Sequence, residues 1–278
     1  MRQHQPPFDP REPVPGWTVD RHLDAFASGY FPMAISHREL DLITESNESS
    51  EEAWLELSRQ DPQPVGMDNT ERDIGEVHWY MPRHRALLPL TPEAGLHVPR
   101  GIARLLRRNH FTFRTDTAFE EVVRRCSRTR SETDRPWIDR RIFAMYRHLH
   151  AAGHAHSMEA CRTDPRTGET HVVGGIYGLS IGSIFFAESM FHEPRPRLPG
   201  GERDPLDGTN ASSCALIRMC DHLHACGYTV LDVQMKNEHT ERFGVEEIHH
   251  KAFDRLLDTA VRSEDRWRPL GPKLAGSR

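Results

Sequence analysis

The apolar residues of this 278-residue chain recur with two different periods, and each period predicts one kind of element. Apolar positions three and four residues apart, opened by a capping residue or closed by Gly, predict helices. Gly29 is expected to end the first helix, and Asp139 and Asn210 are expected to cap two others. The helices are predicted within residues 17–33, 100–108, 118–126, 139–152 and 211–226.

Short alternating runs that are rich in β-branched and aromatic residues predict strands between these helices. The turn at residues 164–168 should join two of the strands as a hairpin. Residues 37–74 are acidic and Ser-rich, and are expected to form a variable insertion, or a weak helix followed by a linker. Residues 192–208 have no periodicity and are expected to form a loop. The strands are predicted at residues 77–80, 86–89, 111–113, 154–161, 171–179, 183–188 and 229–234.

This order of elements predicts an α/β (α+β) fold, with a mixed sheet flanked by helices. Pro82 interrupts the strand pattern, so we place a domain boundary there. The sequence therefore predicts a small N-terminal domain over residues 1–82, which carries the acidic insertion, and a second domain over residues 83–278.

Two polar side chains stand out in the last predicted strand. Asp232 and Gln234 lie two residues apart in the mostly apolar run TVLDVQ. Because residues i and i+2 of a strand point to the same face, the two side chains should lie together. One interpretation is a base and an orienting group beside a cleft. The alternative is an edge strand with one face in water.

Charge is distributed unevenly along the chain. Hydrophobic residues make up 37% and charged residues 28%, and the net charge is -5. Arg residues concentrate in 100–147, and Arg104, Arg107 and Arg108 share one face of a predicted helix. That face is either simply solvated or a contact for nucleic-acid phosphates. No apolar run approaches the roughly 20 residues of a membrane span, and the N-terminus lacks a signal-peptide core, so we predict a cytoplasmic protein.

Several other chemistries lack their usual motifs. Neither a G-x-G-x-x-G nor a Walker A pattern is present, which argues against dinucleotide or nucleoside-triphosphate chemistry. The 18 His residues show no HExxH motif and no Cys/His zinc spacing, so we expect no metal. The five Cys residues show no CxxC pair and lie on apolar faces, which favours small buried thiols over a Cys-His nucleophile.

A series of motifs, in order along about residues 17–260, resembles the leucyl/phenylalanyl-tRNA–protein transferase family. The resemblance implies a small N-terminal domain followed by an acetyltransferase-like (GNAT) domain. The motifs are SGYFPM (28–33), VHWYMPRHRALL (77–88), LHVPR (96–100), WI (137–138), GHAHS (153–157), VGGIYG (173–178), FFAESMF (185–191), NAS (210–212), LDVQ (231–234) and HTERFGVEEI (239–248).

The resemblance implies a reaction and its catalytic residues. Leucine or phenylalanine, or another apolar amino acid, would pass from aminoacyl-tRNA to the α-amine of a protein N-terminus that bears Arg or Lys, marking that protein for degradation. By this similarity Asp232 orients or polarises Gln234, and Gln234 meets the attacking amine. Glu188 would receive the cationic end of the acceptor peptide; its alternative is a structural ion pair.

The resemblance also assigns the donor side. Trp137, Tyr146 and Met33 fall where the family holds the tRNA 3′ end, and Arg104, Arg107 and Arg108 would contact the acceptor stem. Aminoacyl-tRNA is then a co-substrate, no cofactor is expected, and neither membrane nor DNA is a partner. The amino-acid pocket would be lined by Ile176, Phe185, Leu216, Met219, Leu223 and Leu231, each of which also suits a hydrophobic core.

Some positions depart from the family pattern. Met33 replaces a Trp, Ser213 replaces a Lys, and Ala187 replaces a Gly. These changes leave the transferred amino acid and the accepted N-termini open. Two other classes stay open as well: a GNAT-like acyltransferase with another acyl donor, such as acyl-coenzyme A, and a non-catalytic relative that binds tRNA or N-degrons.

Overall fold

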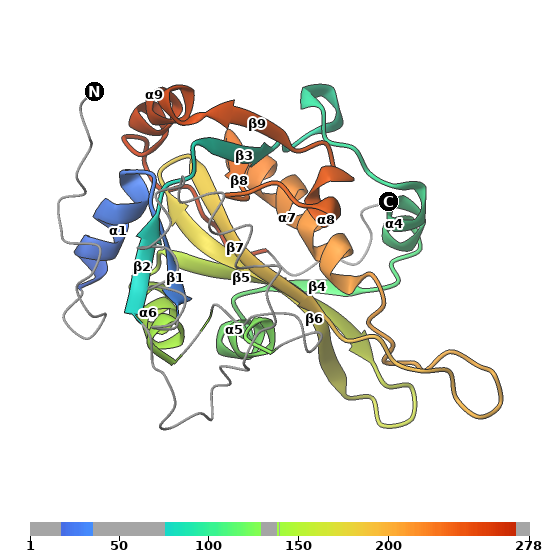
Figure 1. Cartoon of the computed structure of the whole chain (residues 1–278). Helices are drawn as coiled ribbons and strands as arrows, with labels where there is room; N and C mark the ends of the chain where they lie inside the picture. Colours follow the sequence, from blue (N-terminus) through green and yellow to red (C-terminus); the bar gives the residue numbers. More distant parts are fainter. Residues whose placement is uncertain (1–17, 36–75, 129–137, 139, 271–278) are drawn as a thin grey trace.

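The computed structural model describes residues 18–35, 76–128, 138 and 140–270 (Figure 1). Three sequence predictions therefore lie outside the described residues. These are the insertion at 37–74, the cap at Asp139, and the contact of Trp137 with the tRNA 3′ end. Among the described residues, no helix combines the length and apolar character needed to cross a bilayer.

A seven-stranded sheet forms the centre of the molecule, in the order β4-β5-β6-β7-β8-β3-β9 (Figure 1). Neighbouring strands are antiparallel except β7 and β8, which are parallel. A parallel pair needs a long crossover, and helix α7 (Ala211–Cys226) supplies it. The strands are β3 (His84–Leu88), β4 (Thr112–Thr115), β5 (Ala155–Thr163), β6 (Thr170–Ile181), β7 (Ile184–His192), β8 (Val230–Asp232) and β9 (Glu246–His249).

A second, two-stranded sheet consists of β1 (Phe31–Ile35) and β2 (Glu76–Tyr80), which pair antiparallel. The chain passes from the small sheet to the large one between Tyr80 and His84. Both sheets contribute to one hydrophobic cluster, which includes Trp79 of β2 and Phe186 of β7. The domain boundary at residue 82 stays a prediction.

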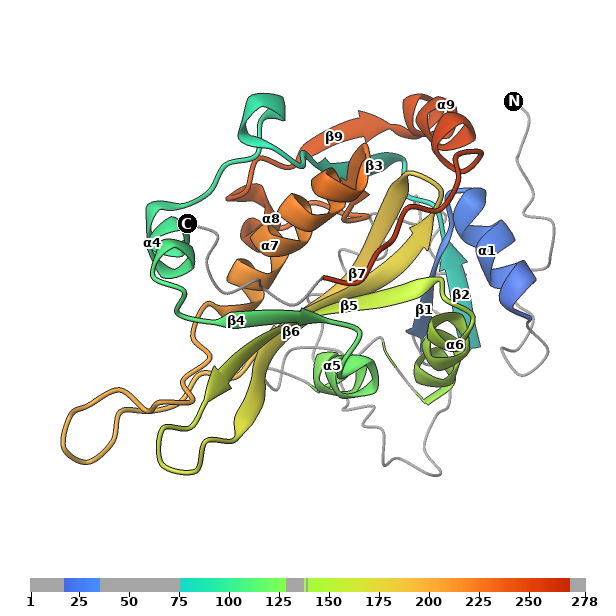
Figure 2. The ribbon, with the colours of Figure 1, turned by 180° about the vertical axis from the view of Figure 1, so that it is seen from behind.

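Helices cover both faces of the large sheet (Figures 1 and 2). Two hydrophobic clusters pack against the large sheet. The first is the cluster that contains Trp79 and Phe186, and it takes apolar residues from α5 and α6; the second takes them from α7. Strand β7 shows why two clusters form, because Ile184 and Phe186 belong to the first cluster, while Phe185 and Ala187 belong to the second. The helices are α1 (Val19–Ala27), α4 (Arg100–Arg107), α5 (Phe119–Cys126), α6 (Arg140–Ala151), α7, α8 (Glu238–Glu241) and α9 (His250–Ala260), with a 3₁₀ turn η2 (Pro92–Ala94).

The mixed sheet flanked by helices confirms the predicted fold class, and the hairpin of β5 and β6 is present. The prediction that Asn210 caps α7 is wrong. Its side chain makes no capping hydrogen bond, and its backbone has φ 69°. A residue in the left-handed region does not have the extended backbone that aims a capping side chain at the first turn.

The prediction that Asp232 and Gln234 share one strand face is also wrong, because β8 ends at Asp232. Gln234 has φ 58° and lies at the centre of a γ-turn, in which Met235 N–H donates to Val233 O at 2.7 Å. The Asp232 carboxylate closes the turn by accepting the Gln234 backbone N–H at 2.8 Å. Side-chain direction at Gln234 therefore follows from a turn, not from strand alternation.

Candidate functional site

Gln234 and Glu188 are brought together by the parallel pair of strands. Phe186 of β7 lies opposite Asp232 of β8, and each strand then leads to a polar residue two positions further on. The Gln234 side-chain amide donates from Nε2 to Glu188 Oε1 at 3.2 Å. The structure thus unites the two residues that the sequence predicted from different motifs.

A β-bulge sets the direction of the Glu188 side chain. In the pairing of β6 with β7, Gly178 lies opposite Ala187 and Tyr177 lies opposite Ser189, so Glu188 is the extra residue. A bulge leaves one residue unpaired and turns its side chain relative to the regular alternation. Bulges of this kind recur beside active sites, so Glu188 is a candidate functional residue.

Asp232 is held by a guanidinium that the sequence prediction did not identify. Arg85 of β3 donates from Nε to both carboxylate oxygens of Asp232 at 2.9 Å, and from Nη2 to Oδ2 at 2.6 Å. The side chains are 1% and 0% exposed. With the bond from the Gln234 backbone, both Asp232 oxygens accept hydrogen bonds from protein, and the side chain is closed to solvent. Asp232 therefore serves as a fixed negative anchor.

Glu188 has the opposite surroundings. It is half-buried, and within the described part of the chain it forms no ion pair. Burial raises the pKa of Glu188 from 4.5 to about 8; the Tyr146 side chain lowers this pKa, the charge of Asp232 raises it, and Arg85 lowers it. A cation that approaches Glu188 would favour its ionised form.

Two fully buried tyrosines, Tyr146 of α6 and Tyr177 of β6, stand beside Glu188. Their rings meet edge to face at 5.0 Å, and the pKa of each is raised by burial and by the neighbouring Glu188. Tyr146 acts on the Glu188 carboxyl group, yet neither hydroxyl reaches good hydrogen-bond geometry with a described residue. Buried hydroxyls usually have partners, so these two are an exception, and they make the surroundings of Glu188 polar.

The residues predicted for the amino-acid pocket do lie together. All six belong to the cluster that packs between the large sheet and α7, and none is more than 2% exposed. Tyr146 and Tyr177 belong to the other cluster, across the sheet. Strand β8 pairs with β7 only as far as Phe186, whereas β7 continues to His192, so the last part of β7 has no β8 residues beside it. The six residues are Ile176, Phe185, Leu216, Met219, Leu223 and Leu231.

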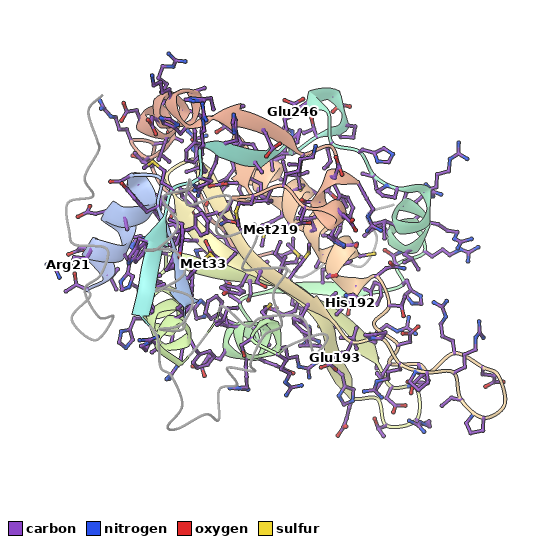
Figure 3. All side chains as sticks on the ribbon, in the orientation of Figure 1. Arg21, Met33, His192, Glu193, Met219 and Glu246 are labelled. Atoms are coloured by element: carbon purple, nitrogen blue, oxygen red, sulfur yellow. The ribbon has the colours of Figure 1, made fainter. Side chains whose placement is uncertain are left out.

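The residues predicted for tRNA contact are spread over the molecule. Met33 lies in β1, 6% exposed, in the same cluster as Tyr146. Figure 3 shows Met33 at the small sheet and Met219 at α7. Arg104, Arg107 and Arg108 are exposed at helix α4, far from β1 in Figures 1 and 2, and their side chains form no ion pair with any described residue. The buried Ile102 confirms that α4 is amphipathic, with its Arg residues turned outward.

Another cluster has the composition of a metal site. Asp116, His150 and His156 place one possible ligand atom each within 4.8 Å of one another. However, His156 Nδ1 lies 2.9 Å from Asp116 Oδ2, and its Nε2 lies 3.1 Å from Gly153 O. His150 Nδ1 lies 2.7 Å from Ala155 O. A hydrogen-bond network accounts for these groups, and we assign no metal to them; the expectation of no metal site stays a prediction.

Arg85 and Tyr177 are the residues that sequence reasoning missed. Arg85 precedes the apolar run at 86–89, where an isolated Arg is usually a solvated strand end. Tyr177 lies among glycines in the strand predicted at residues 171–179. The available signals were the motifs VHWYMPRHRALL at 77–88, which includes Arg85, and VGGIYG at 173–178, which includes Tyr177; neither motif says what these residues contact.

Comparison with known proteins shows the family of this chain. The leucyl/phenylalanyl-tRNA protein transferase family matches over residues 90–258. A leucyl/phenylalanyl-tRNA–protein transferase of Salinibacter ruber is 36% identical over 207 residues, which cover 74% of this chain and 78% of that protein. The one of Paramagnetospirillum magneticum is 32% identical over 242 residues, covering 87% and 88%. The one of Deinococcus radiodurans is 39% identical over 188 residues, covering 66% and 79%. The chain therefore belongs to the leucyl/phenylalanyl-tRNA protein transferase family.

Proposed function

We propose that this enzyme transfers leucine or phenylalanine from an aminoacyl-tRNA to the α-amine of a protein N-terminus, and that Gln234 and Glu188 form the centre of the reaction. The observation that carries the proposal is the hydrogen bond of the Gln234 amide to Glu188 beside the anchored Asp232. The names of the relatives, which cover most of the chain, support the same reaction.

The chemistry is aminolysis of an ester. It needs a neutral amine, a destination for the protons that leave the nitrogen, and stabilisation of the carbonyl oxygen. The ester of an aminoacyl-tRNA is already activated, so holding the amine against the carbonyl carbon can supply most of the rate. The uncharged side-chain amide of Gln234 suits the task of holding the amine in place, because it donates from Nε2 and accepts at Oε1 without changing its charge.

The two carboxylates take different parts in this proposal. Asp232 accepts the Gln234 backbone N–H, not its side chain, so Asp232 orients Gln234 by fixing the turn. Glu188 receives the cationic end of the acceptor. A cation that binds beside Glu188 favours its ionised form, so binding is coupled to release of a proton. Acceptors that begin with Arg or Lys fit a half-buried carboxyl group that has no cationic partner among the described residues.

On the donor side, the six pocket residues on the α7 face would hold the leucine or phenylalanine side chain. Such an apolar pocket selects by size and shape, at about 1–3 kcal/mol per methylene. Arg104, Arg107 and Arg108 would contact acceptor-stem phosphates, since they are exposed and have no carboxylate partner among the described residues. Met33, Trp137 and Tyr146 are proposed for the tRNA 3′ end.

The setting of the reaction is part of the proposal. We propose that the enzyme works in the cytoplasm, where charged tRNA is found, and that its products are marked for degradation. No cofactor is required, because the aminoacyl ester carries the energy for peptide-bond formation.

A single assay tests the proposed function. The protein is incubated with a mixed pool of charged tRNAs and a peptide that begins with Arg, and the products are identified by mass. We expect addition of one Leu or Phe residue to that peptide. The same peptide with an acetylated N-terminus is the matched control and should stay unmodified. A protein that binds the charged tRNA and yet modifies neither peptide would contradict the proposal.

A further inference from the structure

The backbone of Gln234 adopts a conformation that a non-Gly residue does not hold without help. Its φ of 58° lies in the left-handed region, and the γ-turn around it brings Met235 N–H to Val233 O at 2.7 Å. Such conformations cost about 1–3 kcal/mol and persist only where the surroundings enforce them. Neighbouring groups must therefore enforce this turn.

Strand β3 and Asp232 hold the turn from both sides. Ala86 N–H donates to Gln234 O at 3.0 Å, and Val233 N–H donates to Ala86 O at 2.9 Å. Asp232 Oδ1 accepts the Gln234 N–H at 2.8 Å. The peptide groups on both sides of Gln234 are therefore fixed, and the only side-chain atom among these contacts belongs to Asp232.

Arg85 in turn fixes Asp232. Its guanidinium covers both carboxylate oxygens, and a Lys would offer a single point charge in place of this planar fork. The remaining nitrogen, Nη1, donates to Gly29 O at 2.9 Å. Arg85 also lies 5.1 Å from the ring centre of Phe31 and 4.8 Å from that of Phe253. The guanidinium thus has contacts on every side and a single position.

We propose that Arg85 is a positioning residue of the transfer reaction: it fixes Asp232, and through Asp232 the turn that aims the Gln234 amide at Glu188. The proposal rests on the proposed function only in that Gln234 meets the acceptor amine. It also gives the N-terminal part of the chain a role in catalysis, because Gly29 and Phe31 hold Arg85 in place.

A purely structural ion pair and a positioning residue predict different kinetics. If Arg85 only stabilises the fold, its replacement lowers the amount of folded enzyme, and each folded molecule keeps its rate. If Arg85 positions Gln234, folded molecules keep their affinity for both substrates and lose rate, because a shift of about 1 Å at a reacting group can cost about 10²-fold.

The test compares Arg85→Lys and Arg85→Met in the full-length protein. Arg85→Lys keeps the positive charge and removes the fork, whereas Arg85→Met removes both and is the variant more exposed to misfolding. Arg83→Lys, the same exchange at an exposed Arg of the same chain segment, is the matched control. The kcat for transfer and the KM for the peptide and for charged tRNA are measured per folded molecule. The temperature is one at which circular dichroism shows that each variant is folded.

We expect Arg85→Lys to lower kcat by about 10²-fold with less than about threefold change in either KM, and Arg83→Lys to leave both unchanged. In an Asp232→Asn background, Arg85→Lys should add no further loss, because both changes act through the same turn. Wild-type kcat per folded Arg85→Lys molecule, or a full additive loss in the Asp232→Asn background, would overturn the proposal. Absence of transfer by the wild-type protein would instead overturn the proposed function.

Discussion

Asp232 and Glu188 are two carboxylates that both contact Gln234, and their surroundings are opposite. Asp232 is fully buried and accepts from Arg85 and from a backbone N–H. Glu188 is half-buried and has an amide and two tyrosines as neighbours, with no ion pair among the described residues. The negative charge of Asp232 is paired with the Arg85 guanidinium, whereas Glu188 has no such partner among the described residues.

Their surroundings give Asp232 and Glu188 different tasks, although an Asp or a Glu side chain could perform either one. A buried carboxylate that is paired with a guanidinium and hydrogen-bonded on both oxygens holds geometry. A carboxyl group whose pKa burial raises to about 8 changes charge near neutral pH, when a cation arrives. Environment, not residue type, assigns the anchor and the titrating group.

The largest expected effect is on stability, and it distinguishes the two carboxylates directly. Asp232→Asn leaves the Arg85 guanidinium buried beside a neutral amide, so the free energy of unfolding should fall by about 3–5 kcal/mol. Glu188→Gln removes no charge partner among the described residues and should not lower the free energy of unfolding at pH 7. Because the raised pKa of Glu188 opposes folding at that pH, this variant should be more stable than the wild type. Urea unfolding of both variants measures this, and equal losses would show that the two sites do not differ as described.

The next effect concerns the strained turn between the carboxylates. Gln234→Gly should lower transfer by roughly 10²-fold, since the amide is lost. The same change should raise the free energy of unfolding by about 1 kcal/mol, because Gly adopts the left-handed region without strain. Gln234→Ala, which keeps the strain, is the control: it should lose activity without gaining stability. If both variants lose stability equally, the turn is not strained.

The pH dependence of stability provides a third comparison. The pKa of Glu188 is raised from 4.5 in the unfolded chain to about 8 in the fold, so between these values the folded state binds more protons. The stability contributed by Glu188 is therefore present below pH 4.5 and is lost as the pH rises through about 8. The slope for one proton is at most about 1.4 kcal/mol per pH unit.

Glu188→Gln should remove this slope, so the variant becomes more stable relative to wild type as the pH rises. Urea unfolding of both proteins at several pH values between 5 and 8 measures the difference. Parallel curves for the two proteins would mean that Glu188 titrates normally in the fold.

The smallest effect comes from the two tyrosines. Tyr177→Phe removes a buried hydroxyl with no described hydrogen-bond partner, so stability should change by less than about 1 kcal/mol. Tyr146→Phe should be similarly mild in stability, but it should raise the pKa of Glu188 further, because Tyr146 lowers that pKa. Carboxyl-carbon NMR titration separates the two variants. An unchanged Glu188 pKa in Tyr146→Phe would show that Tyr146 does not act on it.

Much of the fold followed from the sequence because its information is local. Apolar residues at helical spacing, with Gly227 at the end, predicted α7 with its observed bounds. The alternating runs around the turn at 164–168 predicted the hairpin of β5 and β6. Motif order placed Asp232, Gln234 and Glu188 in one site before any geometry was available. Each of these inferences needs only residues close in sequence, or a pattern shared with relatives.

Only the tertiary structure decided how these residues are used. Arg85 meets Asp232 across 147 residues of chain, and no periodicity links the two positions. The end of β8 and the turn at Gln234 depend on contacts with β3, so the strand that the pattern predicted through residue 234 stops at Asp232. The bulge at Glu188 depends on the register of β6 against β7. Charge pairing, burial and strain are properties of neighbours in space, so a sequence names the residues and the fold assigns their roles.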